Sequence, residues 1–338
     1  MRYRRVYIQG LQVVVPPVEV TTRSLERMLG PMYRRLGLSE GILEGLTGVR
    51  SRRFWPDAST SADGAAQAAR AVLDAEGMRA SDVQVLVSTS VSKDFLEPPI
   101  ASLVGGELGV GEQCANFDVG HACLGFMSGM LTVANLIELG QVDVALVVAG
   151  ESSRTVTQAT VRRLLQGSSD FGTFRDNLAT LTLGSMGVAA LLVSEDRATT
   201  GHQFLGGVSR ASTRHSRLCL GTATEMTTDA PTLLKAGVDL ASTTYEALHD
   251  ELELPRGPVR EHILHQVGKA NHDALIGRLG LPAERVLRLY EEFGNVGAAG
   301  VPFTLATAAA QGRLTPGEEV LLLGIGSGLN CTMLGIRW

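Results

Sequence analysis

The sequence has few cysteines and no long apolar run. Its 338 residues include only Cys114, Cys123, Cys219 and Cys331, and no two of them form a CxxC pair. This spacing signals neither a zinc site nor a disulfide framework. No uninterrupted apolar run approaches the roughly 18–20 residues that a bilayer-spanning helix needs. We therefore predict a cytoplasmic protein with reduced thiols and no membrane span.

Lysine is also scarce. It occurs only at positions 93, 235 and 269, so arginine supplies the other 27 of the 30 basic residues, and the formal net charge is −5. No basic stripe alternates with aromatic residues, which form 5 % of the chain. Nucleic acid is therefore not an expected partner. Such an arginine bias also gives any one arginine little functional weight.

Glycine, in contrast, is abundant at 39 residues, and apolar residues form 44 % of the chain. Apolar runs of strand length alternate with helical stretches, which is typical of an α/β fold with buried strands. We expect strands at residues 6–15, 83–89, 114–119, 142–149, 187–193, 261–267, 286–289 and 319–324. We expect helices at residues 61–76, 99–108, 123–139, 235–251, 271–279 and 302–311.

The second half of the chain repeats the order of the first. In each half, a pair of strands that flank a helix leads to a turn, a helix of small residues and a further strand. The turn is at 121–123 in the first copy and at 294–297 in the second. Paired central helices would bring the two turns together. We therefore divide the chain into an N-terminal half, 1–196, and a C-terminal half, 197–338.

Several residues at strand ends and turns are candidates for chemistry. Cys123 follows a strand and opens a helix, where free amides and the helix dipole favour a thiolate; the alternative is an inert buried thiol. His265 ends a strand, where α/β sheets commonly face ligands, and Asn295 lies between glycines that are typical of a turn. The segment 324–328 has too little chain after it for dinucleotide binding, so its amides are oxyanion-hole candidates.

Taken in order, these residues resemble a known family. Cys123, His265-Gln266, Gly294-Asn295-Val296-Gly297 and the terminal Gly-Ile-Gly-Ser-Gly are similar to the thiolase-fold condensing enzymes of the ketoacyl synthase III branch. Segments 89–98, 117–124 and 322–331 are most similar to the OleA-type enzymes of bacterial long-chain olefin biosynthesis, which join two fatty acyl-CoA molecules head to head. The resemblance implies a thiolase fold of two pseudo-duplicated βαβαβαββ halves in a five-layer αβαβα arrangement.

The resemblance also implies a role for each candidate residue. Cys123 would be acylated by the first acyl-CoA. His265 and Asn295 would face the thioester oxygen of the second acyl-CoA. The main-chain N–H groups of Cys123 and Ser327 would hold the oxyanion of the acyl-cysteine step. Glu97 matches a glutamate that reaches the neighbouring subunit's site and removes the α-proton, which implies a homodimer.

The expected surroundings of Glu97 are apolar, because Phe95, Leu96 and two prolines adjoin it. Burial among such side chains strengthens a carboxylate as a base. A malonyl-using synthase forms its carbanion by decarboxylation and needs no such base, whereas joining two ordinary acyl-CoAs does. The composition alone, however, favours an ordinary loop carboxylate.

The resemblance gives less specific substrate contacts. Gly326 and Gly328 are substrate-binding candidates, and Arg50 belongs to an Arg-Ser-Arg-Arg cluster that resembles a basic stretch near the CoA nucleotide in relatives. A solvated charged face is an equally good interpretation of the cluster. No metal and no cofactor are implied, since CoA thioesters are the substrates. Downstream enzymes of an olefin pathway are the further partners implied.

Two departures from the family pattern bear on the alternatives. Val267-Gly268 follows His265-Gln266 where ketoacyl synthases usually carry Ala-Asn, which favours the olefin-type branch. Gly300 stands where serine is commoner, which affects the packing of the Asn295 loop. The remaining alternatives are a decarboxylative 3-oxoacyl-[acyl-carrier-protein] synthase III, a papain-like cysteine hydrolase whose Cys-Gly-Ser-Cys-Trp context is missing here, and a catalytically silent subunit.

Overall fold

The computed structural model describes residues 1–254 and 259–338. None of the helices in these ranges combines the length and apolarity that a membrane span requires. The largest sheet is built from strands of both halves of the chain: β1 (Val6–Val14), β4 (Val85–Ser88), β5 (Ala115–Asp118), β6 (Val144–Glu151), β7 (Met186–Ser194), β8 (Gln203–Ala211), β11 (Glu261–Leu264), β12 (Glu319–Gly326) and β13 (Asn330–Arg337).

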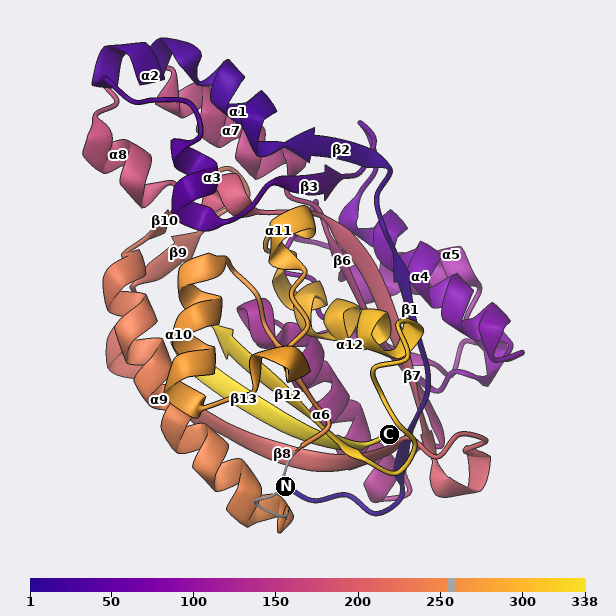
Figure 1. Cartoon of the computed structure of the whole chain (residues 1–338). Helices are drawn as coiled ribbons and strands as arrows, with labels where there is room; N and C mark the ends of the chain where they lie inside the picture. Colours follow the sequence, from indigo (N-terminus) through magenta and orange to yellow (C-terminus); the bar gives the residue numbers. More distant parts are fainter. Residues whose placement is uncertain (255–258) are drawn as a thin grey trace.

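The order of the strands separates the two halves of the chain. It runs β11-β12-β13-β8-β1-β7-β6-β4-β5, so strands before η4 (Glu195–Arg197) lie on one side and later strands on the other. The two sides meet where β1 pairs with β8 through Tyr7 and Gln203. Figure 1 shows β8, β12 and β13 crossing the lower region of the molecule while β1, β6 and β7 rise beside them.

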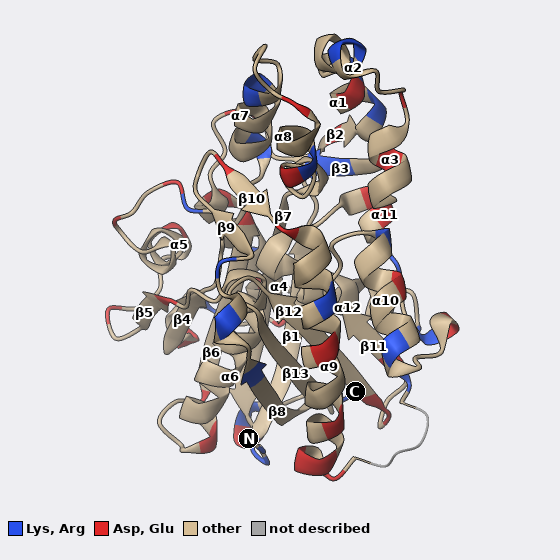
Figure 2. Ribbon diagram, turned by 90° about the vertical axis from the view of Figure 1, so that its left-hand side faces the viewer, with Lys and Arg blue, Asp and Glu red and all other residues tan. Residues whose placement is uncertain are grey.

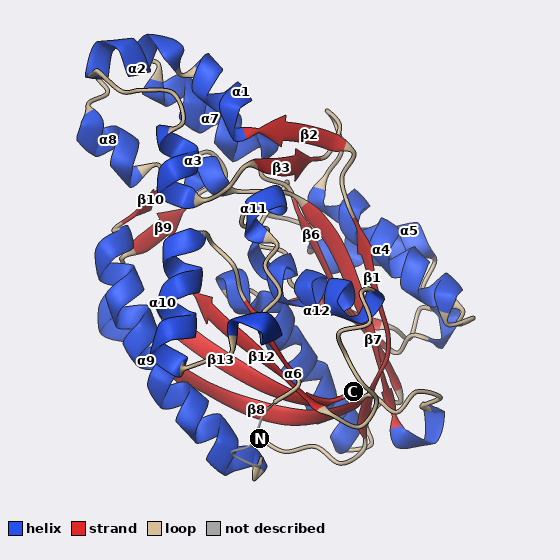
Figure 3. Cartoon of the chain, viewed as in Figure 1, coloured by secondary structure: helices blue, strands red, loops and turns tan. Residues whose placement is uncertain are grey.

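Helices cover and separate the two sides of the sheet (Figure 3). Helix α4 (Ser61–Ala75) packs on the outer face of β6 and β7, with α5 (Ile100–Leu108) on β4 and β5. Helices α6 (Gly125–Glu138) and α12 (Gly300–Ala310) pack together between the two sides. Helix α9 (Ala230–Leu252) covers β8 and β13, and α10 (Lys269–Leu279) packs against α9. The predicted five-layer thiolase arrangement is confirmed.

The central helix α6 is buried because its side chains are apolar on nearly every face. Phe126, Met127 and Ile137 are among its buried residues. A Cβ on Gly125 would lie 2.5 Å from the carbonyl oxygen of Thr89, and one on Gly129 would lie 2.6 Å from Thr89 Cγ2. These two glycines therefore let α6 lie directly against the chain that leaves β4.

Most of the expected strands and helices are confirmed with shifted ends, but the strand expected at 286–289 is wrong. Gln266 takes the place of a neighbouring strand there. Its side-chain oxygen accepts hydrogen bonds from the N–H groups of Leu289 (2.7 Å) and Tyr290 (3.0 Å), and its Nε2 donates to the carbonyl of Leu287 (2.9 Å). The side chain of Gln266 thus satisfies the main-chain hydrogen-bonding groups of this segment. The strand expected at 261–267 is correspondingly shorter, since β11 ends at Leu264.

A group of short elements above the sheet was not predicted (Figure 1). Its apolar cluster includes Leu25, Met32, Leu43, Leu164 and Phe174.

The remaining elements, from this group and from elsewhere in the chain, are α1 (Thr22–Met28), α2 (Gly30–Leu36), α3 (Ile42–Thr47), α7 (Arg154–Leu164), α8 (Phe171–Asp176), α11 (Tyr290–Phe293), β2 (Val18–Thr21), β3 (Ser51–Phe54), β9 (Cys219–Gly221), β10 (Met226–Thr228), and the 3-10 turns η1 (Ala80–Asp82), η2 (Ala122–Leu124), η3 (Thr180–Thr182), η5 (Thr213–His215), η6 (Ala283–Arg285) and η7 (Gly297–Ala299).

Candidate active site

Cys123 lies on the η2 turn between β5 and α6. The residue before it, Ala122, has φ of 45°, in the left-handed region that side chains other than glycine and asparagine adopt at a cost. Leu124 is fully buried, whereas Cys123 stays partly exposed. The turn is therefore anchored by its leucine and presents its thiol.

The glycines at the end of β12 bring this strand onto the Cys123 turn. A Cβ on Gly324 would lie 2.5 Å from Leu124 Cδ2, and one on Gly326 would lie 3.4 Å from the Leu124 amide nitrogen. Gly328 has φ of 82° and turns the chain toward β13. Ser327 thus follows a backbone that already touches the Cys123 turn. The assignments of Gly326 and Gly328 to substrate binding remain predictions.

Asn295 is held in place by its own turn and by the first half of the chain. Its side-chain oxygen accepts a hydrogen bond from the N–H of Gly297 (3.0 Å). Its main-chain N–H donates to the carbonyl of Thr182 (2.9 Å), and its carbonyl accepts from Gly184 (2.8 Å). The side chain is 8 % exposed. With its oxygen already occupied, the amide is left with its NH₂ group to offer to a substrate oxygen.

His265 directly follows β11 and is buried against the start of α12. Its main-chain N–H donates to the carbonyl of Leu323 (2.8 Å). Neither ring nitrogen has a hydrogen-bond partner within the described residues. Burial lowers the pKa of His265 from 6.5 to about 4. The imidazole is therefore neutral at pH 7 and one ring N–H remains available to a ligand.

The structure brings these groups together from both halves of the chain. The η2 turn packs against η7 and β12, and α12, which begins at Gly300, packs against β11. A Cβ on Gly300 would lie 3.2 Å from His265 Nδ1. The prediction that the two turns meet is confirmed. Cys123, the His265 imidazole and the Asn295 turn thus border one site.

The expectation that the helix start favours a thiolate at Cys123 is wrong for the unliganded chain. Burial is the largest of the effects that raise the pKa of Cys123 to about 12, and the negative charge of Glu151 and the thiol of Cys219 add to it. The reason is geometric: α6 begins at Gly125, so Cys123 precedes its free amides instead of lying over them. Desolvation outweighs a dipole at that position.

Glu97 is exposed on the loop between β4 and α5. The neighbouring side chains Phe95 and Leu96 are 54 % and 97 % exposed. Asp94 holds the first part of this loop in place by accepting a hydrogen bond from the N–H of Ser61 (2.7 Å). The apolar burial expected for Glu97 is therefore not provided by its own chain.

The arginine cluster at 50–53 divides between surface and interior. Arg50 is exposed and pairs with Glu291 (3.0 Å) and Glu292 (3.3 Å) of α11, which lies beside β3 (Figure 2). Arg52 is fully buried and donates to the carbonyl of Leu181 (2.8 Å) and to Thr22 Oγ1 (3.0 Å). A solvated face is thus the wrong interpretation for Arg52, while the role of Arg50 remains a prediction.

Glu151, at the end of β6, is a buried carboxyl that the sequence reasoning did not select. It is 3 % exposed, and its oxygens accept hydrogen bonds from the N–H groups of Val91 (2.9 Å), Ser92 (3.1 Å) and Ala298 (3.2 Å). A signal was present, because an acidic residue that ends an apolar strand next to a parallel neighbour stands where α/β sheets face their ligands.

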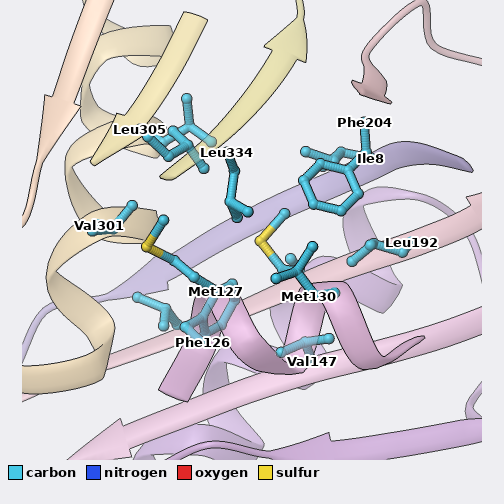
Figure 4. Close-up of a cluster of buried hydrophobic side chains, with 14 of the residues drawn as sticks. Ile8, Phe126, Met127, Met130, Val147, Leu192, Phe204, Val301, Leu305 and Leu334 are labelled. Atoms are coloured by element: carbon cyan, nitrogen blue, oxygen red, sulfur yellow. The ribbon is translucent and has the colours of Figure 1, made fainter. Parts of the chain in front are cut away.

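A narrow apolar space lies between α6 and α12. Figure 4 shows Met127 of α6 pointing toward Val301 of α12, and Met130 pointing toward Phe204 and Ile8. The lining is apolar throughout: Ile8, Leu11, Phe126, Met127, Met130, Ala190, Val301, Pro302, Leu305 and Leu322. Phe126, Met127 and Met130 follow Cys123 by one and two helical turns. These side chains nearly fill the space, so an acyl chain attached to Cys123 could enter it only if they moved.

Comparisons with known proteins agree with this geometry. Residues 117–209 match the family model of 3-oxoacyl-[acyl-carrier-protein] synthase III, and residues 250–338 match the model of its C-terminal region. Among curated proteins, the acyl-CoA:acyl-CoA alkyltransferases of Xanthomonas campestris and Shewanella oneidensis are 36 % and 38 % identical to the chain, with both partners covered in full. The chain belongs to the acyl-CoA:acyl-CoA alkyltransferase family.

More distant members carry a different name. The β-ketoacyl-[acyl-carrier-protein] synthase III of Symbiobacterium thermophilum is 28 % identical over 100 % of this chain and 99 % of its own length. All three relatives align along the whole chain, and the identity is lower to the synthase III than to the two alkyltransferases.

Solved structures of an alkyltransferase superpose closely. OleA of Xanthomonas campestris with bound cerulenin has a TM-score of 0.97 at 36 % identity, covering 100 % of this chain and 98 % of its own. A cysteine-to-serine variant with bound lauric acid and lauroyl-CoA has the same TM-score, covering 99 % and 100 %. Other structures substitute one glutamate, one cysteine and one histidine of that enzyme. The intervals between those positions equal the intervals between Glu97, Cys123 and His265.

Proposed function

We propose that this protein joins two fatty acyl-CoA molecules head to head by a non-decarboxylative Claisen condensation. The observation that carries this proposal is the full-length identity with two alkyltransferases, supported by the packing of the Cys123 turn against η7, the turn that follows Asn295. The protein is an acyltransferase. The proposed reaction uses CoA thioesters and no further cofactor.

Acylation is the first proposed step. The Cys123 sulfur attacks the thioester carbonyl of the first acyl-CoA, a new C–S bond forms, and the thiol proton leaves with the departing CoA thiolate. The raised pKa of Cys123 favours the neutral thiol, so the proton is lost during this step. The apolar side chains that follow Cys123 along α6, among them Met127 and Met130, are the proposed surroundings of the acyl chain.

Carbon–carbon bond formation is the second proposed step. A base takes the α-proton of the second acyl-CoA, and the oxygen of the resulting enolate accepts hydrogen bonds from the neutral His265 and from Asn295. The enolate carbon attacks the acyl-cysteine carbonyl, whose oxyanion lies at the N–H groups of Cys123 and Ser327. Collapse breaks the C–S bond, and the released sulfur regains the proton from the base. Hydrolysis of the product thioester then gives a 2-alkyl-3-keto acid.

The proposed base is Glu97 of a second copy of the chain. Its exposure, and that of Phe95 and Leu96 beside it, leaves an apolar loop without cover in one chain. Large exposed apolar side chains grouped in this way are typical of interfaces. The proposal therefore includes a homodimer in which each loop completes the partner's site. Downstream olefin-pathway enzymes and a cytoplasmic location also belong to the proposal; four unpaired cysteines support the location.

The second candidate function is decarboxylative condensation with a malonyl thioester, favoured by the synthase III names of the more distant relatives. Purified protein incubated with myristoyl-CoA alone separates the two. Release of CoA together with a 3-keto acid, or with the ketone left by its decarboxylation, is the expected result. Product formation that strictly requires added malonyl thioester would overturn the proposal.

A further inference from the structure

One buried carboxyl, at the end of β6, binds two separate segments beside the site. Glu151 Oε1 accepts hydrogen bonds from the N–H of Val91 (2.9 Å) and of Ala298 (3.2 Å). Glu151 Oε2 accepts from the N–H (3.1 Å) and the hydroxyl (2.8 Å) of Ser92. Each oxygen thus receives two donors, and all of these donors are neutral. Such a carboxyl can accept all four bonds only because both of its oxygens are acceptors.

The segments that Glu151 joins carry the groups proposed to act on the second substrate. Val91 and Ser92 begin the loop that leads to Glu97. Ala298 belongs to η7, the turn that follows Asn295. A Cβ on Gly297 would lie 3.0 Å from the carboxyl carbon of Glu151, so this turn rests directly on the carboxyl. The hydroxyl of Ser92 also accepts a hydrogen bond from the N–H of Ser152 (3.0 Å), which ties the loop back to the chain after β6.

We propose that Glu151 is a positioning residue for the condensation, fixing the Asn295 turn and the start of the Glu97 loop against β6 beside the Cys123 thiol. This inference rests on the proposed function. Glu151 has a task that none of the substrate-facing residues performs. The two segments that it holds are a turn and a loop, and no other residue in the described structure is seen to accept hydrogen bonds from the main-chain N–H groups of both. Loops that must be placed within a fraction of an ångström need such support.

The charge of Glu151 gives the proposal a second readout. Burial raises the pKa of Glu151, but every group bonded to its two oxygens is a donor, and these hydrogen bonds favour the carboxylate. As a carboxylate it contributes to the raised pKa of Cys123, after burial, and Cys219 contributes less. The elements packed against η2 are α6, β12, β13 and η7. Their own titratable groups lie elsewhere: Glu138, Glu319 and Arg337 stand at the distal ends of their elements, and Cys331 bonds to Thr244. Removal of the Glu151 charge therefore lowers the pKa of Cys123.

Two substitutions of Glu151 separate the effect of its negative charge from the effect of its side-chain length. Glu151→Gln keeps the length but turns one oxygen into an NH₂ group, so two donors on one side face a donor instead of an acceptor. Glu151→Asp keeps the charge but withdraws both oxygens by one methylene. The matched control is Glu26→Gln, because Glu26 is also 3 % exposed and its carboxyl accepts the N–H groups of Gly41 and Leu43 (both 2.8 Å) far from the site.

The experiment measures keto-product formation from myristoyl-CoA, thermal unfolding, and the rate of Cys123 alkylation by iodoacetamide at pH 8, read by peptide mass spectrometry. We expect both Glu151 variants to lose about tenfold or more in product formation while remaining folded. We expect Glu151→Gln alone to alkylate about threefold faster or more, and Glu26→Gln to match the wild type in both rates.

Product formation within twofold of the wild type in both Glu151 variants would overturn the proposal. So would alkylation of Glu151→Gln at the rate of Glu26→Gln. If the wild type itself forms no keto product from acyl-CoA, the proposed function fails instead. In that case faster alkylation of Glu151→Gln still supports the placement of Glu151 beside Cys123, and an unchanged rate refutes it.

Discussion

Gly300 and His265 are so close that a single added methyl group on the glycine would lie 3.2 Å from the imidazole Nδ1. This spacing is tighter than ordinary van der Waals contact, so the ring has to move when the space is filled. The family pattern commonly has serine at this position. The glycine here therefore leaves the imidazole room that a larger residue would take, which makes the pair a sensitive probe of the site.

Gly300→Ala is expected to reduce product formation about tenfold without loss of stability. Gly300 has helical φ of −61°, so alanine fits the backbone and improves the helix start by up to about 1 kcal/mol. The added methyl group turns the His265 ring away from its place. CoA release from myristoyl-CoA and a thermal melt check the two effects. Full activity in the alanine variant would show that the ring tolerates the contact.

Cys123→Ala is expected to abolish acyl transfer to the protein while leaving the fold intact, because the residue is not part of the buried core and alanine removes only one sulfur atom. Intact-protein mass spectrometry after incubation with myristoyl-CoA detects the added acyl group. Cys114→Ala is the control, since this residue is buried and its thiol donates a hydrogen bond to the carbonyl of Ala115 at the start of β5, and acylation should persist. Normal turnover by Cys123→Ala would refute the nucleophile assignment.

Most of the correct predictions of the fold came from the alternation of strand-length and helical segments in the sequence. Cys123 and Asn295 were found because each occupies the turn that leads into an apolar, small-residue helix, and a duplicated order places such turns together. The same reasoning failed at 286–289, where the partner of an extended segment is the side chain of Gln266 rather than a strand. A sequence pattern of period two does not reveal which group will satisfy its amides.

Glu151 shows why the rest of the site escaped prediction. Its partners Val91 and Ala298 are 60 and 147 residues away in the sequence and contribute only main-chain N–H groups, which leave no trace in residue identity. The helices at 22–47 and 154–176 were missed for a related reason. Most of them span six or seven residues, too few to establish a helical period.

Glu97→Ala is expected to leave acylation of Cys123 intact and to block carbon–carbon bond formation, because the proposed base acts only on the second substrate. The acyl-enzyme should therefore accumulate in mass spectra while keto product is absent. Glu107→Ala is the control, since Glu107 is an exposed glutamate on α5 in the same region of the chain. Wild-type product formation by Glu97→Ala would exclude this base.

Mixing the two variants tests whether Glu97 acts across a dimer. Cys123→Ala lacks the nucleophile and Glu97→Ala lacks the base, so neither should form product alone. In a mixed dimer, the loop of the Cys123→Ala chain supplies Glu97 to the site that retains the cysteine. We expect product formation to return to about a quarter of the wild-type level after equal mixing and exchange of subunits. No recovery, with exchange shown by mass spectrometry, would place the base within its own chain.

The buried imidazole of His265 should make the free energy of unfolding fall in mild acid. Its pKa in the folded chain is about 4, against 6.5 when unperturbed. Below pH 6.5 the unfolded chain takes up a proton that the folded chain does not, so protonation favours unfolding until the pH reaches about 4.

His265→Asn removes this contribution of the imidazole to the free energy of unfolding. Between pH 7 and pH 5 its free energy of unfolding should therefore fall by about 1–2 kcal/mol less than that of the wild type. Urea unfolding at both pH values measures the difference, with His215→Asn as the control at a histidine that is not buried. Equal losses in the wild type and His265→Asn would mean that the imidazole is already charged in the folded chain at pH 5, which would conflict with a neutral hydrogen-bond donor at the enolate.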